Sequence, residues 1–198
     1  MRHAGVVALV AILAGAAFAA VRPQEPFNDA VSIGLSSDQA ARTRFHAPYI
    51  ERLGGPVIQA LEVVTEFRRM VLLAEAHARA GEAGWDAARA AAALAPYRGR
   101  VDVILHLQFS PQNTYRTVPP VSVVLYTRGG GPPLRPGHVE VTPANVAGPI
   151  PPGTPILSAR VEAHFPADAL DARGTHLVGV SIDGRETQRI PIDLSRLR

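Results

Sequence analysis

The period of the hydrophobic pattern changes near residue 100, and this change limits the folds that the chain can adopt. Beyond Arg100, apolar and polar residues alternate, as expected of β-strands that bury one face. The inward set of the first such segment is Val101, Val103, Leu105, Leu107 and Phe109. Before Arg100, apolar residues recur every three or four positions, which indicates amphipathic helices. The sequence therefore predicts an α+β protein, in which an N-terminal helical hairpin precedes an antiparallel immunoglobulin-like β-sandwich.

Six alternating segments are expected to form the sandwich. Besides 101–109, they lie near residues 121–125, 139–141, 157–165, 178–182 and 190–194. Loops rich in proline and glycine separate them, as is typical of an all-β domain with short strands. Pro191 cannot donate a hydrogen bond to a neighbouring strand, so the last strand is expected at the edge of a sheet.

The turn between the last two strands predicts their register. A two-residue turn at Asp183-Gly184 would pair Val178 with Arg189 and place arginines on the apolar face. A three-residue loop that ends at Gly184 would pair Val178 with Gln188 and return the later isoleucines to the buried side. We therefore expect a type I turn followed by a bulge, with a positive φ at Gly184.

Two helices are expected between residues 48 and 99. Pro56 suits the first position of a helix, and helical periodicity without a breaker continues to Arg79. The apolar arc of this helix approaches about 200°, which is too wide for one flat contact. A second helix is expected from an N-cap at Asp86 to Ala95, with Trp85 packed back against the first helix as a core anchor.

The N-terminal residues resemble an export signal. A basic head, an uncharged run over 4–21 and small residues at Ala17 and Ala19 predict a secretory signal peptide cleaved after Ala19. The uncharged run approaches the length of about 20 residues that spans a bilayer, so a retained membrane anchor is the alternative. The predicted boundaries are a signal peptide over 1–19, a leader over 20–47, the helical hairpin over 48–99 and the β-sandwich domain over 100–198.

The leader is expected to contain at most one short helix, from Asp38 to Arg44, with Ser37 as its cap. The segment from Gly34 to Asp38 lacks the closing glycine of a serine-hydrolase elbow. A capping role for Ser37 is therefore favoured over a nucleophilic one.

Composition excludes several classes of chemistry. The chain has no cysteine, so it forms no disulfide and has no thiol nucleophile or thiolate metal ligand. All 20 residues counted as lysine or arginine are arginines, which excludes a P-loop lysine and Schiff-base chemistry. The net charge is only +3, and arginines are mixed with acids along the chain, so we expect no nucleic-acid binding. No cofactor is expected.

Some histidines and acids offer weak signals of a metal or catalytic site. Glu162 and His164 share one face of a predicted strand, and His106 lies on the outward face of another. No tight ligand spacing supports a metal site, so we interpret these residues as solvated strand positions and expect no metal. Asp168 and Asp171 lie in an expected corner between strands, where aspartates ordinarily form turns rather than paired catalytic carboxylates.

One loop between strands carries a weak binding signal. It combines amide, aromatic and guanidinium groups of the kind that bind sugars or peptides, namely Gln112, Asn113, Tyr115 and Arg116. The alternative interpretation is structural: Asn113 forms a turn, and the ring of Tyr115 packs over the end of the sandwich.

We expect an exported, non-enzymatic protein of the bacterial cell envelope that binds another envelope protein or a surface polymer. Exclusive use of arginine, with abundant alanine, glycine and proline, is typical of a GC-rich bacterial genome. Export would place the protein in the periplasm, on the cell surface or outside the cell. The alternative is a periplasmic hydrolase or carbohydrate-active enzyme that uses loop carboxylates and histidines. A retained leader would instead indicate a membrane-tethered accessory subunit.

Overall fold

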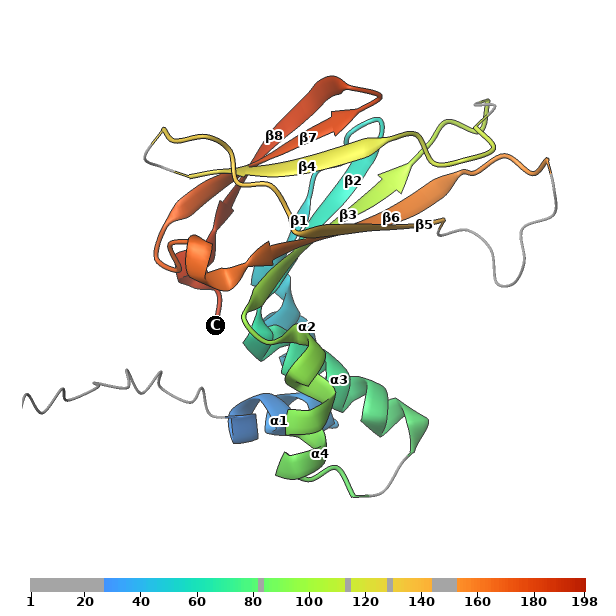
Figure 1. Ribbon diagram of the computed structural model, residues 1–198. Coiled ribbons are helices and arrows are strands. Elements are labelled where there is room, and N and C mark those ends of the chain that lie inside the picture. Colours follow the sequence, from blue (N-terminus) through green and yellow to red (C-terminus); the bar gives the residue numbers. More distant parts are fainter. Residues whose placement is uncertain (1–26, 82–83, 113–114, 128–129, 144–152) are drawn as a thin grey trace, which may run out of the picture.

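The computed structural model describes residues 27–81, 84–112, 115–127, 130–143 and 153–198. Its helices gather at one end of two antiparallel sheets, so the predicted α+β class is confirmed (Figure 1). The expected signal peptide and the start of the leader lie outside these residues. Among the helices within the described ranges, none has the length and apolar character needed to span a bilayer.

The helices and strands follow one another in a simple order. The N-terminal part contains α1 (Phe27–Leu35), α2 (Gln39–His46), β1 (Ile50–Arg52), β2 (Ile58–Val64), α3 (Glu66–Ala80) and α4 (Ala87–Leu94). The C-terminal part contains β3 (Arg100–Gln108), β4 (Val121–Tyr126), β5 (His138–Pro143), β6 (Ser158–Pro166), β7 (Thr175–Ile182) and β8 (Arg185–Asp193). Short 3₁₀ turns follow α2, α4, β6 and β8.

The strands form two sheets that share one core. Sheet A has five strands in the order β1-β2-β3-β6-β5, and sheet B has three in the order β4-β7-β8. One hydrophobic cluster joins them, and it includes Val103 and Val161 of sheet A with Val123 and Val178 of sheet B. The six segments expected from alternation are all strands, and the inward set of β3 is buried as expected. An immunoglobulin-like arrangement stays a prediction.

The expected long helix from Pro56 to Arg79 is wrong, because its first part is strand β2. In β2, a bulge between Ile58 and Ala60 interrupts the pairing with β3. The bulge places the buried residues Ile58 and Leu61 three positions apart in the sequence, which is the spacing of a helix rather than of a strand. The wide apolar arc therefore resulted from joining a strand to the helix that follows it.

Helix α3 begins only after Thr65, whose side-chain oxygen accepts a hydrogen bond from the backbone N–H of Arg68 at 3.2 Å. The residues before that cap pair with strands on both sides, β1 and β3. Pairing across the sheet places Leu61 opposite Leu105 and so fills the core between the sheets. Tertiary pairing therefore outweighs the helix-like spacing of this segment.

The N-terminal helices differ in part from expectation. Helix α2 matches the expected short helix, but its cap is Asp38, whose carboxylate accepts from the N–H of Ala41 at 2.9 Å; the expected cap at Ser37 is wrong. A carboxylate is the better acceptor beside the positive end of a helix. Helix α1 was not expected. It packs on α3, where Gly34 allows close approach to Ala74.

The predicted start of α4 is confirmed, since the carboxylate of Asp86 accepts from the N–H of Arg89 at 2.8 Å. Helix α4 joins α1 and α3 in a second hydrophobic cluster, separate from the core of the sheets. Trp85 packs against this cluster, and its ring lies 4.6 Å from the ring of His77. Its expected role as a core anchor is confirmed.

The loop predicted between β7 and β8 is wrong in length. Asp183 and Gly184 form a two-residue turn with positive φ at both positions, 50° and 74°. The expected positive φ at Gly184 is confirmed. The register shift occurs after the turn instead of within it: Ser181 pairs with Glu186, whereas Val180 pairs with Gln188. This bulge buries Ile190 and Ile192, and β8 is an edge strand, as Pro191 predicts.

Candidate binding site

The face of sheet A directed away from the core carries charged side chains on adjacent strands. Glu62 of β2 lies opposite Ile104 of β3, which lies opposite Glu162 of β6. Two residues along β3, Asp102 lies opposite His164 of β6. Because successive side chains of a strand point to opposite faces, these residues share the side of the sheet that the core does not use.

Arg69 of α3 neutralises the buried acids of this face. Its Nη2 donates a short hydrogen bond to Asp102 and another to Oε1 of Glu162, at 3.0 Å. The guanidinium of Arg100 lies 3.0 Å from Asp102, and that of Arg160 lies 2.6 Å from Glu162. Asp102 and Glu162 are 1% and 7% exposed, so the interpretation of Glu162 as a solvated residue is wrong.

A second ion-pair cluster surrounds Glu62. Its carboxylate accepts a hydrogen bond from Arg68 at 2.5 Å and lies 3.2 Å from Nε2 of His106. Burial opposes ionisation of Glu62, but the hydrogen bond to His106 and the charges of Arg68, His106 and Arg160 outweigh burial and lower its pKa below 4.5. Glu62 is therefore ionised at neutral pH and is poorly suited to act as a general acid.

Three groups that can ligate a metal do come together. Asp102, Glu162 and His164 have ligand atoms within 4.8 Å of one another, and Nδ1 of His164 lies 2.8 Å from Asp102. His106, the third histidine or acid that the strand pattern offers beside Glu162 and His164, lies against Glu62 instead. A divalent cation would have to displace guanidinium groups that already hold both carboxylates. The trio therefore fits an ion-pair network better than a metal centre.

A hollow of about 780 Å³ opens where α2, β1 and the second half of α3 diverge. This volume falls within the range of about 300–1,000 Å³ that is usual for ligand sites. The hollow, called the arginine groove below, is lined by Gln39, Arg42, Thr43, His46, Ala47, Ile50, Glu51, Arg52, Glu75 and Arg79. Three arginines thus reach one concave surface from three elements.

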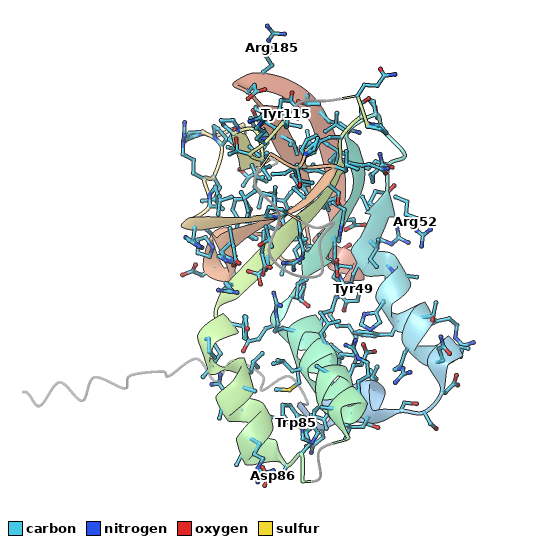
Figure 2. The ribbon with its side chains drawn as sticks, turned by 90° about the vertical axis from the view of Figure 1, so that its right-hand side faces the viewer. Tyr49, Arg52, Trp85, Asp86, Tyr115 and Arg185 are labelled. Carbon is cyan, nitrogen blue, oxygen red and sulfur yellow. The ribbon has the colours of Figure 1, made fainter. Side chains whose placement is uncertain are left out.

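The arginine groove is lined by three arginines and two acids, Glu51 and Glu75, so arginines are in excess by one charge. Oε1 of Glu75 lies 2.9 Å from Nε2 of His46 and 4.0 Å from Nε of Arg42. The carboxylate of Glu75 therefore already has partners within the lining of the groove. The Nε–H of Arg79 donates a hydrogen bond to the carbonyl of Glu75 at 3.3 Å. Arg52 is exposed, and its side chain has no ion-pair or hydrogen-bond partner in the described part of the chain. Figure 2 shows it at the outer margin of the sheet, on β1.

A smaller hollow of about 280 Å³ lies on the other side of β1, between the margins of the two sheets. It includes Glu51, Leu61 and residues of β8 and of the C-terminal 3₁₀ turn. Neither this hollow nor the arginine groove is lined by His106, His164, Asp168 or Asp171. Asp171 accepts a hydrogen bond from the N–H of Arg173 at 2.9 Å, the contact of a turn-forming aspartate.

The described residues of the loop over 112–116, which carries the weak binding signal of the sequence, lie outside both hollows. Gln112 and Arg116 are exposed, and Asn113 lies outside the described residues. The ring of Tyr115 packs edge-on against Phe109 at 5.4 Å, as in the interpretation that places it over the end of the sandwich. None of the described loop residues lines either hollow. A binding role for this loop stays a prediction.

The arginine groove has no signal in the sequence, because its parts are far apart in the chain. Arg42 falls in the expected leader, and Arg79 falls at the end of the expected helix from Pro56, which is too long. Strand β1, which carries Arg52, has only 3 residues, too few for an alternating pattern to identify it as a strand. Comparisons with protein-family models, with curated proteins and with solved structures found no match.

Proposed function

We propose that the chain is an exported, non-enzymatic interaction module of the bacterial cell envelope, which binds an anionic partner in the arginine groove. The partner is another envelope protein or a surface polymer. The observation that carries this proposal is the convergence of Arg42, Arg52 and Arg79 on one hollow of about 780 Å³. In this proposal, a hairpin of α3 and α4 and an immunoglobulin-like sandwich form the rigid support of the site.

The chemistry of the groove favours carboxylate or sulfate groups on the partner. A guanidinium presents several N–H donors in a planar fork that matches such groups. Glu75 is engaged by His46 and lies 4.0 Å from Arg42, and the three arginines of the lining outnumber its two acids, Glu51 and Glu75. The site is open at the surface, so side chains or sugar units of a longer chain can enter it without unfolding of the protein.

The hydrolase alternative has less support from the described hollows. An active site needs a concave surface on which titratable groups converge with suitable pKa values. The acids that lie close together, Asp102 and Glu162, are held by arginines, and the pKa of Glu62 is lowered rather than raised. A binding module therefore accounts for more of the described side chains.

A titration with polyanions tests the proposal. Fluorescently labelled poly-L-glutamate and polygalacturonate are titrated with the purified full chain, and anisotropy reports binding. At least one of the two polymers is expected to bind, with an affinity that falls as salt is added. The variant Arg42→Gln/Arg52→Gln/Arg79→Gln is expected to bind that polymer at least about tenfold more weakly, which equals about 1.4 kcal/mol.

The control removes the same charge elsewhere. Arg135→Gln/Arg173→Gln/Arg185→Gln changes three exposed arginines outside the groove, and Figure 2 places Arg185 at the tip of the sheets, well away from Arg52. This variant is expected to keep affinity within about twofold of the parent. Equal losses in the two triple variants, or no binding of either polymer by the parent chain, would refute the proposed site.

A further inference from the structure

Within the described ranges, strand β1 is an edge of sheet A, and one side of its backbone pairs with no other described strand. The N–H of Leu53 donates to the carbonyl of Gln59 at 2.9 Å, and Glu51 pairs with Leu61 in the same register. In an antiparallel pair, positions that exchange hydrogen bonds alternate with positions that do not. The backbone groups of Glu51 therefore point to β2, and those of Arg52 point away from it.

The outward side of β1 offers three backbone groups. The N–H and the carbonyl of Arg52 face the open edge, as does the carbonyl of Ile50. The N–H of Ile50 is already used, since it donates to the carbonyl of Ala47. An added strand can pair with the three remaining groups while its side chains alternate between the two faces.

The arginine groove begins at this same edge. Ile50, Glu51 and Arg52 all line it, so a strand added to β1 would pass along its wall. The side chain of Ile50 is 37% exposed, which leaves an apolar surface beside the guanidinium groups. The other edges lack this combination: β4 is bridged by Leu134, β8 contains Pro191, and neither described hollow is lined by residues of β5.

We propose that the partner is a protein with an acidic segment, which binds in an extended conformation as an additional strand on β1. Its carboxylates occupy the arginine groove, and an apolar side chain covers Ile50. This inference rests on the proposed function and chooses an acidic protein segment over a surface polymer. Charge complementarity with Arg42, Arg52 and Arg79 identifies the occupant, and the outward backbone groups of β1 identify its conformation.

N-methylated peptides separate strand addition from simple charge attraction. The probe is the heptapeptide Thr-Glu-Thr-Val-Thr-Glu-Thr, in which the acids and the valine share one face of the strand, as Ile50 and Arg52 do on β1. It is compared with two versions that carry N-methyl groups at the odd or at the even positions. All three have the same charge. If the peptide adds to β1, one methylation pattern removes the hydrogen bonds to β1 and weakens binding at least about tenfold, whereas the other changes it by less than about threefold. Chemical shifts of the isotope-labelled full chain report affinity.

A pair of variants provides an independent arm. Arg52→Gln removes the charge, whereas Arg52→Pro removes the charge and the outward N–H. Proline is tolerated at edge positions whose N–H faces away from the sheet, and far-ultraviolet circular dichroism checks that the fold is kept. Strand addition predicts that Arg52→Pro binds the peptide at least about fivefold more weakly than Arg52→Gln.

The outcomes distinguish this inference from the proposed function. Equal affinity for the three peptides, or for the two Arg52 variants, would overturn strand addition while leaving the arginine groove as an anion site. Binding of polygalacturonate without binding of the peptide would overturn the choice of a protein partner. Loss of the difference between the two triple variants would overturn the groove itself.

Discussion

The guanidinium of Arg68 in α3 lies 2.5 Å from the carboxylate of Glu62 in β2, and the arginine is only 2% exposed. The same guanidinium donates to the carbonyl of Val63, and it lies 4.8 Å from the ring centroid of Tyr49. A cation buried to this degree requires such partners, because desolvation alone would be costly. This pair therefore fixes the first turns of α3 against sheet A, beside the arginine groove.

Glu62→Gln is expected to lower the free energy of unfolding by about 1–3 kcal/mol, because Arg68 would stay buried without its counter-charge. Urea unfolding at pH 7 measures the change. As a control, Glu186→Gln removes the partner of Arg189 at a solvent-exposed ion pair and is expected to leave stability nearly unchanged. Equal effects of the two substitutions would contradict a special role for the buried pair.

Stability is expected to fall in acid, in part through Glu62. The pKa of Glu62 is lowered below 4.5 in the folded chain, so the unfolded chain binds the proton more readily. The contribution of Glu62 is complete above pH 4.5 and is lost as the pH falls through the lower, folded pKa. Urea unfolding at several values between pH 7 and 3 is expected to show a smaller acid loss for Glu62→Gln than for the parent. Parallel curves would contradict this assignment.

The strands of the C-terminal half could be predicted because their alternation is long and regular. Val101 to Phe109 alternates over a whole strand, and no other periodicity explains the pattern. Strand β2 could not be predicted in this way, since its bulge gives the buried residues Ile58 and Leu61 the spacing of a helix. Local pattern therefore identifies strands that pair regularly, but a bulge that long-range pairing imposes has no local signature.

The candidate site could not be predicted for a different reason. Arg42, Arg52 and Arg79 belong to three elements, and only the fold brings them to one hollow. The same holds for Arg69, which reaches Asp102 and Glu162 from a helix. Turn and cap chemistry, in contrast, is local, and Asp86 and Gly184 were identified from their immediate neighbours alone.

The contact between α1 and α3 is expected to be sensitive to one methyl group. A Cβ at Gly34 would lie 2.5 Å from Cβ of Ala74 and from the carbonyl of Val71. Gly34→Ala is therefore expected to lower the free energy of unfolding by about 1–3 kcal/mol through overpacking. Thermal or urea unfolding measures this loss, and Gly34→Ala/Ala74→Gly is expected to recover part of it. If Gly34→Ala were neutral, α1 would not pack as closely as described.

The two-residue turn between β7 and β8 is expected to require a glycine. Gly184 has φ of 74°, so Gly184→Ala is expected to lower the free energy of unfolding by about 1 kcal/mol, although nothing lies within 4 Å of the new methyl group. Gly137→Ala is the control, since its Cβ also meets open space and its φ lies outside the left-handed region. Equal stabilities of the two variants in urea would contradict the turn geometry.

The network around Arg69 is expected to show strong coupling between residues far apart in the sequence. Arg69→Gln leaves the buried Asp102 and Glu162 with one cation fewer, so we expect a loss of about 3 kcal/mol in the free energy of unfolding. Arg69→Lys keeps the charge but cannot present a planar fork to both carboxylates, so an intermediate loss is expected.

Asp102→Asn separates charge from packing in this network. On its own it removes one buried carboxylate and leaves Arg69 with Glu162 as its ionised partner. In Arg69→Gln/Asp102→Asn, the cation and one acid are removed together, so the loss is expected to be at least about 1 kcal/mol smaller than the sum of the single losses. Urea unfolding of the parent, of the two single variants and of the double variant measures this coupling. Additive losses would mean that Arg69 acts by packing alone and that the paired charges do not fix α3 against the sheet.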